Sequence, residues 1–206
     1  MNMAKKQAKK KFKILAAGDI HGDSDLARKL AERAKKENVD LVILTGDIVG
    51  LIETDNLIKP FTDRKEKVLF VPGNWDKPET AEFLARRYGI KNLHEYHAKY
   101  GNIGIFGMGN PGTLMINEKE TFETLKKNWE KVKNLEKKIM VTHMHAAGTK
   151  SELSGFEGSK GIRKAIEKLQ PDLFISGHIH ELEGIEEKIG KTRIINVGRR
   201  GKIIEI

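Results

Sequence analysis

The sequence predicts a single α/β domain, and three observations lead to that fold class. Short apolar runs rich in β-branched residues alternate with segments of helical periodicity, and turn residues separate them. The length of 206 residues suits one domain whose core needs no cross-linking. No internal repeat, linker or low-complexity segment interrupts residues 12–206. We therefore expect one domain, with parallel strands in its first part and antiparallel strands in its last part.

The first half of the domain is expected to alternate strands with helices. Apolar residues at helical spacing, from Leu26 to Ala34, predict the first helix, and Asp23 and Ser24 are interpreted as its caps. Pro78 opens the next helix, because its missing N–H costs nothing in a first helical turn. The expected elements are strands over 12–17, 41–45 and 68–71, a helix around 26–34 and a helix over Pro78–Tyr88.

In the second half of the domain, from His94 onward, the hydrophobic pattern changes from helical spacing to that of strands. Two β-rich runs flank Gly101 and Asn102, which predicts a hairpin. Residues 146–160 are rich in glycine and serine, and a loop of that length often carries function. The expected elements are hairpin strands over Tyr96–Tyr100 and 103–106, an amphipathic helix over 120–135, strands over 139–142 and Leu173–Ser176, a helix over 162–169, and a terminal antiparallel meander over 183–189, 192–197 and 202–206.

Composition excludes several classes of protein. The chain has no cysteine, which rules out disulfide frameworks, thiolate zinc sites, iron–sulfur clusters and cysteine nucleophiles. No apolar run approaches the roughly 20 residues of a membrane-spanning helix, and the lysine-rich start lacks the apolar stretch of a signal peptide. We therefore expect a soluble, cytoplasmic protein without a membrane partner.

The net charge of +9 is concentrated at the N-terminus. Six lysines lie within the first thirteen residues, which include no acidic residue, and the rest of the chain is only weakly basic. We interpret residues 1–11 as a basic flexible tail and residues 12–206 as the domain. Attraction of this tail to a nucleic acid is the alternative interpretation.

Five apolar runs end in the same way, with a polar side chain just beyond the end of the run. Glycines accompany four of them and permit sharp turns and close backbone approach. Sheets of this type place their ligand sites at the carboxyl ends of the strands, so these side chains are expected to gather at one edge. The five segments are 18–21 (Gly-Asp-Ile-His), 45–47 (Thr-Gly-Asp), 73–76 (Gly-Asn-Trp-Asp), 142–145 (Thr-His-Met-His) and 176–180 (Ser-Gly-His-Ile-His).

Two pairs of these side chains are spaced two residues apart, which on an extended backbone directs both members to one side of the chain. The pairs are Asp19 with His21 and His178 with His180, and Asp47, Asn74 and His143 complete a set of seven oxygen and nitrogen ligands. One divalent ion rarely needs seven protein ligands, whereas two ions that share a bridging carboxylate would use them all. Carboxylate and imidazole ligands without sulfur suit manganese, iron, zinc, cobalt or nickel.

Any one of these residues alone would more often form a turn or cap a helix. Five matching strand ends are not expected by chance, so the prediction of a metal site rests on all seven residues together. His94 and His97 lie in the hairpin region without such a pattern, and we interpret them as ordinary histidines.

The five segments resemble the motifs of the calcineurin-like metallophosphoesterase superfamily, in the same order and at comparable spacing, over about residues 12–206. The compact length is similar to that of its small prokaryotic and archaeal phosphodiesterases. The resemblance implies a four-layer α-β-β-α sandwich, with two mixed β-sheets flanked by helices and a pair of metal ions at the carboxyl ends of the strands. It further implies a divalent-metal-dependent hydrolase of phosphoric esters, with phosphodiesters as the first choice of substrate and manganese as the first choice of metal.

Carried over residue by residue, the resemblance implies one metal ion held by Asp19, His21, Asp47 and His180. The second ion would be held by Asp47 as the bridge, Asn74, His143 and His178. A water that bridges two cations becomes hydroxide near neutral pH and can attack phosphorus in line, so no covalent enzyme intermediate is needed. Asp47 and Asn74 are therefore expected to act in catalysis as well as in metal binding.

One position departs from the pattern of the superfamily. Many relatives have a histidine after the asparagine of the third motif, which is thought to assist the leaving group, and this chain has Trp75 there. Indole does not titrate in water and cannot act as a general acid. His145 is expected either to replace that acid or to orient a metal ligand. Trp75 is expected either to stack on a base or aryl group or to pack at the rim of the site.

Two alternatives to a phosphodiesterase remain at this point. A non-enzymatic metal-binding scaffold is suggested by the missing histidine, although the complete ligand set argues against it. A nuclease is supported only by the lysine-rich tail. The expected partner is a small phosphoester substrate, nucleic acid has weaker support, and the sequence leaves a homo-oligomer open.

Overall fold

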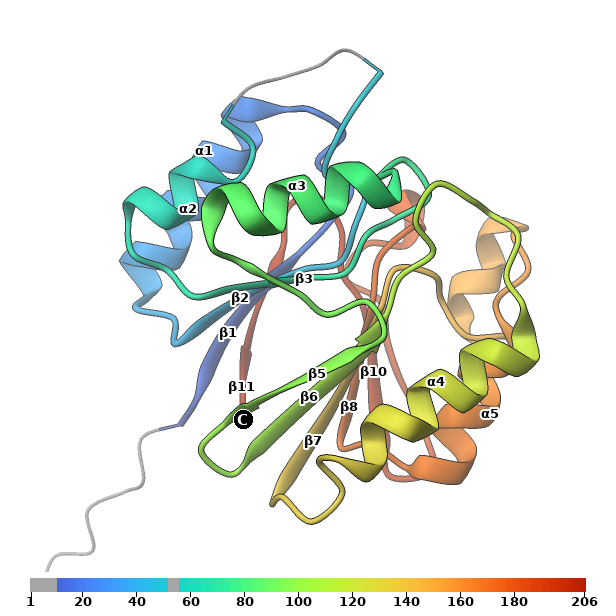
Figure 1. The fold of residues 1–206 in the computed structure, drawn as a ribbon. Coiled ribbons are helices and arrows are strands. Elements are labelled where there is room, and N and C mark those ends of the chain that lie inside the picture. Colours follow the sequence, from blue (N-terminus) through green and yellow to red (C-terminus); the bar gives the residue numbers. More distant parts are fainter. Residues whose placement is uncertain (1–10, 52–55) are drawn as a thin grey trace, which may run out of the picture.

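Two β-sheets lie face to face at the centre of the molecule, and helices cover the outer face of each (Figure 1). These features come from a computed structural model that describes residues 11–51 and 56–206. The expected four-layer α-β-β-α sandwich with two mixed sheets is thereby confirmed. Within the described residues no helix is both long and apolar enough to cross a membrane.

The first sheet has the strand order β11-β1-β2-β3-β4. Strands β1 to β4 run parallel, and β11 pairs antiparallel with β1. Their bounds are β1 (Lys13–Ala17), β2 (Leu41–Leu44), β3 (Val68–Phe70), β4 (Lys91–Asn92) and β11 (Lys202–Glu205), and the covering helices are α1 (Ser24–Glu37), α2 (Lys59–Asp63) and α3 (Pro78–Tyr88). Because Ala17 pairs with Leu44 and Leu44 with Phe70, the carboxyl ends of the three central strands are level.

The second sheet has the strand order β5-β6-β7-β8-β10-β9. Strands β6, β7, β8 and β10 run parallel, and β5 and β9 close the two edges in antiparallel pairings. The bounds are β5 (Tyr96–Tyr100), β6 (Ile103–Met108), β7 (Lys137–Thr142), β8 (Leu173–Ser176), β9 (Glu186–Ile189) and β10 (Thr192–Asn196), with helices α4 (Glu118–Glu130) and α5 (Lys160–Leu169) outside and short 3-10 helices at η1 (Lys150–Ser154) and η2 (His180–Leu182).

The core follows the period of two along the strands. In β1, Ile14 and Ala16 are buried between the two sheets, whereas Leu15 and Ala17 pack under the helices of the first sheet. Both faces of the central strands are therefore apolar, as is usual for parallel strands covered on both sides. The polar residues that end these strands lie at the sheet edge and do not enter the core.

The terminal strands differ from the expected meander. β10 is buried and pairs parallel with β8, so only β9 and β10 form an antiparallel hairpin. β11 leaves this sheet and pairs with β1, which buries Ile204 between the two sheets. The prediction of parallel strands early in the chain is confirmed for β1 to β4. The prediction of antiparallel strands late holds for β9 and β11 but was wrong for β8 and β10, which pair in parallel.

Smaller differences concern element ends. The expected helix over 120–135 begins at Glu118 and ends at Glu130, and Val132 still packs in the core beyond it. The expected loop over 146–160 contains the 3-10 helix η1, and α2 and β4 were not predicted. Residues 1–10 of the expected basic tail lie outside the described residues, and Lys11 is exposed and pairs with Glu205 at 3.1 Å.

Candidate metal centre

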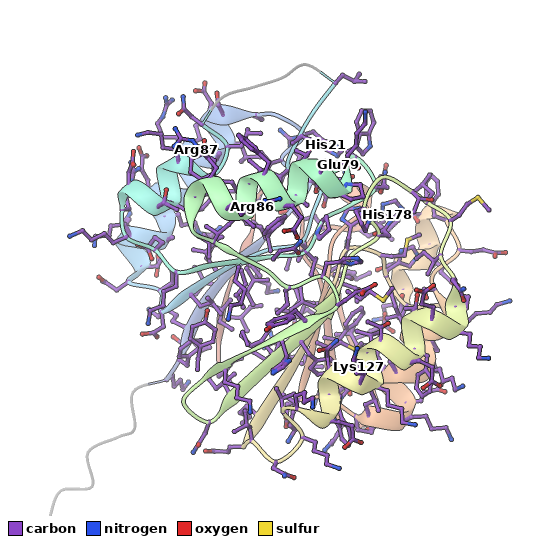
Figure 2. The ribbon with its side chains drawn as sticks, viewed as in Figure 1. His21, Glu79, Arg86, Arg87, Lys127 and His178 are labelled. Atoms are coloured by element: carbon purple, nitrogen blue, oxygen red, sulfur yellow. The ribbon has the colours of Figure 1, made fainter. Side chains whose placement is uncertain are left out.

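The carboxyl ends of five strands, three in one sheet and two in the other, meet at one end of the molecule. Figure 2 shows His21 and His178, which come from different sheets, at this same end. All seven residues expected as metal ligands lie here: Asp19 and His21 after β1, Asp47 after β2, Asn74 after β3, His143 after β7, and His178 and His180 after β8. The structure thus brings together every residue of the predicted ligand set.

Asp19, His21 and His180 form the first group, and one ligand atom of each lies within 4.8 Å of the others. The two imidazole Nε2 atoms are 3.3 Å apart, and Nε2 of His180 is 3.5 Å from Oδ1 of Asp19. Asp19 is buried and its carboxylate accepts the backbone N–H of His178, 3.2 Å from each oxygen. This bond ties the loop after β8 to the loop after β1.

Asp47, His143 and His178 form the second group. Nδ1 of His143 donates to the carbonyl of Thr45 at 2.7 Å, which fixes the tautomer and leaves the Nε2 lone pair free for a metal. That Nε2 lies 3.0 Å from Oδ1 of Asn74, so the amide oxygen belongs to the same group.

Asp47 lies between the two groups. Its Oδ2 is 3.6 Å from Nε2 of His21 in the first group and 3.5 Å from Nε2 of His143 in the second. Its other oxygen, Oδ1, accepts the backbone N–H of Trp75 at 2.9 Å. One carboxylate oxygen is therefore fixed by the backbone while the other is shared by both groups.

The donor set fits a pair of divalent cations. Two ligands about 2.1 Å from one metal lie roughly 3.0–3.4 Å apart at octahedral or tetrahedral angles, close to the separations between these nitrogen and oxygen atoms. Burial lowers the pKa of His178 to about 4, with His143 and His145 nearby acting in the same direction, so its imidazole is neutral at pH 7. Burial raises the pKa of Asp47, and a bound cation would offset that desolvation.

The backbone of this site is left-handed at four of the seven residues. The φ angles are 55° at Asp19, 48° at His21, 51° at Asp47 and 73° at His178. The expected extended backbone between the paired residues was therefore wrong, and the side chains converge through tight turns instead. Gly46, with φ +101°, permits one of these turns, because a Cβ there would lie 2.7 Å from Nδ1 of His143.

Two residues that sequence reasoning missed hold these turns. Asp76 is fully buried, and its carboxylate accepts three backbone N–H groups, from Ile48, Val49 and Gly73, at 2.9–3.0 Å. Arg199 donates to the backbone carbonyl of Asp19 at 3.1 Å and to Oδ2 of Asp23 at 2.7 Å. Asp76 ends the third of the five strand-end segments and Arg199 follows β10, but nothing in the sequence signalled that their partners would be these backbone groups.

Residues from both groups line a cavity of about 300 Å³. Its walls include Trp75 and Phe156, which are 41% and 59% exposed, and the carboxylate of Glu181. The lining residues are His21, Asp47, Asn74, Trp75, Phe156, His178, Ile179, His180 and Glu181. Within the part of the chain that the structure describes, this lining includes no lysine or arginine.

His145 lies beside the cavity and is not part of its lining. It is 1% exposed, and its ring lies nearly parallel to that of His178 at a centroid distance of 6.1 Å. Its Nε2 donates to the carbonyl of Phe156 at 3.2 Å, and among the described residues Nδ1 has no hydrogen-bond partner. Burial lowers the pKa of His145. His94 and His97 belong to neither ligand group.

Comparison with known proteins gives one family. The sequence profile of the calcineurin-like phosphoesterases matches residues 12–182, which contain all seven candidate ligands. A search of curated proteins gave no significant match.

Solved structures share the fold at low sequence identity. The protein TT1561 of Thermus thermophilus superposes with a TM-score of 0.75 at 18% identity, over 93% of this chain and 91% of that chain. A dimetal phosphatase from Danio rerio gives 0.57 at 13% identity, over 91% and 88%. A protein described as a novel archaeal phosphodiesterase gives 0.54 at 18% identity, over 94% and 99%. These likenesses show a common fold, and the profile match shows the family.

Proposed function

This chain belongs to the calcineurin-like phosphoesterase family, and on that premise we propose that it is a divalent-metal-dependent phosphodiesterase. The observation that carries the proposal is the position of Asp47, whose Oδ2 lies 3.6 Å from a histidine of the first group and 3.5 Å from a histidine of the second. A carboxylate oxygen shared in this way is what a two-metal site requires. The hydrolase activity follows from the family, and the two-metal centre and the diester preference are our proposal.

In this proposal Asp19, His21 and His180 would hold one ion, Asn74, His143 and His178 would hold the other, and Asp47 would contribute to both. The two cations, with manganese as our first choice among ions that suit oxygen and nitrogen ligands, would lower the pKa of a bound water and stabilise charge on the phosphoryl oxygens. The chain fixes the ligand geometry through the Thr45 carbonyl, which orients His143, and through the Trp75 N–H, which orients Asp47.

The charge of the cavity favours a diester over a monoester. The described lining residues supply no lysine or arginine to balance a second negative charge, and Glu181 adds a carboxylate to the wall. A phosphodiester carries one negative charge, whereas a terminal phosphate carries close to two at neutral pH. The same lack of basic side chains argues against a site that tracks a nucleic-acid backbone.

We further propose that His145 positions the cavity wall and is not the general acid. Its Nε2 proton is already donated to the Phe156 carbonyl, and the ring is almost fully buried. With Trp75 at the usual histidine position, every histidine in the described lining then belongs to a ligand group, so none is free to replace that acid. Leaving groups that are stable as anions, such as nitrophenolate, are therefore expected to depart fastest.

Metal loading tests the shared carboxylate. Metal-free protein reconstituted with excess Mn²⁺ and desalted should retain close to two ions per chain by elemental analysis. Asp47→Asn should lower that number, because the amide removes the bridging charge. Asp25→Asn is the matched control, since Asp25 is exposed on α1 and, among the described residues, pairs with Arg28 at the surface. Zero retained ions, or equal values for the two variants, would refute the bridge.

Hydrolysis tests the substrate class. With Mn²⁺ bound, bis(4-nitrophenyl) phosphate should turn over with a higher kcat/KM than 4-nitrophenyl phosphate, because only the diester matches a cavity without basic side chains. A preference for the monoester would overturn the diester proposal. Full metal occupancy without turnover of any ester would instead support the metal-binding scaffold.

A further inference from the structure

Two exposed aromatic side chains, Trp75 and Phe156, form part of the wall of the candidate metal centre. We propose that they bind a flat aromatic ring, such as a nucleobase, on the ester group that stays on the phosphorus, next to the phosphoryl group. This substrate class rests on the proposed function, since it places the phosphoryl group at the two ligand groups.

Each aromatic ring contacts a histidine of a different ligand group. The ring of Trp75 meets the imidazole of His21 edge to face, with centroids 5.4 Å apart and planes at 87°. The ring of Phe156 meets the imidazole of His178 in the same manner, at 6.2 Å and 71°. An ester bound at these histidines therefore has an aromatic surface beside it on the side of each group.

The chemistry of the wall favours an uncharged, flat substituent. Ligand pockets are lined mainly by hydrophobic and aromatic side chains, so large apolar side chains exposed at a cavity indicate a surface that binds a ligand. Beyond the two ligand groups, the described lining consists of these two rings, the mostly buried Ile179 and the single carboxylate of Glu181. Aromatic rings bind bases through their π faces with little dependence on base identity, whereas a negatively charged substituent would face the carboxylate of Glu181.

The loop that carries Phe156 is fixed before any substrate arrives. The Phe156 carbonyl accepts the proton of buried His145 at 3.2 Å, and its N–H donates to Oγ of Ser154 at 3.3 Å. Two residues later the N–H of Gly158 donates to Oε1 of Glu152 at 2.9 Å. A preorganised wall loses little entropy on binding.

Trp75 is fixed in a comparable way. Its backbone N–H donates to Oδ1 of Asp47, and the carboxylate of the neighbouring, buried Asp76 accepts the backbone N–H of Gly73. The backbone of Trp75 is thus tied to the shared carboxylate, and its ring lies against the imidazole of His21. Loss of the histidine at this position removes an acid, and the residue in its place provides an aromatic surface.

Matched substrates separate recognition from chemistry. Thymidine 5′-(4-nitrophenyl) phosphate and methyl 4-nitrophenyl phosphate expel the same leaving group, and only the first carries a base. Trp75→Leu and Phe156→Leu should each raise KM for the thymidine ester by roughly 2- to 12-fold, the range of an aromatic stacking contact. The KM for the methyl ester should change less than twofold, because its one aromatic ring belongs to the departing nitrophenolate. Both kcat values should also change less than twofold, because the lost contact binds the ground state and the transition state equally.

Phe83→Leu is the control variant. Phe83 is 59% exposed, as is Phe156, but it lies on α3 and not in the cavity lining. It should leave both substrates unchanged. Equal thermal melting points of all three variants would confirm that the fold is intact.

Binding without turnover gives a second readout. The chain has two tryptophans, so Trp129→Phe leaves Trp75 as the only one. In Mn²⁺-loaded protein of this variant, methyl thymidine 5′-phosphate should quench Trp75 fluorescence, whereas dimethyl phosphate, which has the same charge, should not. Adding Phe156→Leu should weaken the affinity for the thymidine ester.

The outcomes distinguish the two proposals. If neither nitrophenyl ester is hydrolysed although Mn²⁺ is bound, the proposed function fails, and the fluorescence titration still tests the aromatic wall. If both esters are hydrolysed and the variants leave their KM ratio unchanged, the phosphodiesterase stands and the aromatic subsite is refuted. Equal quenching by the two alkyl diesters would also refute it.

Discussion

Replacement of Asp76 tests how the site loops are held. Asp76 is fully buried and accepts three backbone N–H groups: Oδ1 accepts from Ile48 at 2.9 Å and Val49 at 3.0 Å, and Oδ2 accepts from Gly73 at 2.9 Å. These bonds join the loop that carries Asp47 to the loop that carries Asn74. Asp76→Asn keeps the shape of the side chain but replaces one acceptor oxygen with an N–H₂ group.

The size of the effect follows from this geometry. If the amide oxygen serves Ile48 and Val49, the amide nitrogen faces the Gly73 N–H, which then has no acceptor. A hydrogen bond to a charged group contributes about 1.5–3 kcal/mol, and a buried N–H without a partner costs about 1–3 kcal/mol. We therefore expect a loss of about 2–4 kcal/mol. For a chain of this size, 1 kcal/mol shifts Tm by about 2–4 °C, so Tm should fall by roughly 5–15 °C.

The assay is a thermal melt in EDTA, followed by circular dichroism, so that metal binding does not contribute. Asp172→Asn is the matched control: Oδ2 of Asp172 accepts one backbone N–H, from Lys138 at 2.8 Å, at a partly exposed site that an amide oxygen can also serve. Its Tm should change by less than about 5 °C. Burial raises the pKa of Asp76, whereas the N–H groups of Gly73 and Val49 oppose that rise. An unchanged Tm for Asp76→Asn would mean that a neutral side chain holds the two loops as well as the carboxylate does, and would refute the reasoning.

Two further predictions concern the leaving group and the tail. Trp75→His should raise turnover of alkyl phosphodiesters by up to ~10²–10⁴-fold and leave turnover of nitrophenyl esters nearly unchanged, because imidazole can protonate a poor leaving group. The check is to measure kcat of the variant on both ester types, and an equal change on both would exclude a missing general acid. Deletion of residues 1–10 should leave hydrolysis of bis(4-nitrophenyl) phosphate within about twofold. If the tail binds nucleic acid, the same deletion should weaken oligonucleotide affinity and flatten its salt dependence, whereas unchanged affinity would exclude that role.

The location of the site could be predicted from the sequence because of a property of parallel sheets. Apolar runs such as β1 and β2 are buried on both faces, so the first polar residue beyond each run lies at the carboxyl edge of the sheet. Asp19 and Asp47 could therefore be placed near each other without knowledge of the strand order. His143 and His178 follow strands of the other sheet, and their place beside Asp19 and Asp47 was implied by the family resemblance.

The supporting residues could not be predicted because their partners are backbone atoms far away in the sequence. Asp76 binds Ile48 and Val49, and Arg199 binds the carbonyl of Asp19. Such contacts depend on the detailed course of two loops, which no periodicity encodes. The position of β11 was missed for a related reason: its alternating pattern predicts a strand but does not identify the neighbouring strand, and the free edge of β1 was its partner.

The left-handed turns explain why these supports are needed and which variants isolate the chemistry. A non-glycine residue in this conformation costs on the order of 1–3 kcal/mol, and four candidate ligands adopt it. The acceptor carboxylate of Asp76 and the guanidinium of Arg199 stabilise backbone groups of those same turns. Asparagine and aspartate tolerate the left-handed region better than most residues. Asp47→Asn therefore preserves the turn and removes the charge and one carboxylate oxygen, whereas Asp47→Ala would also change the backbone preference. A metal deficit in the asparagine variant can accordingly be assigned to the lost bridging carboxylate.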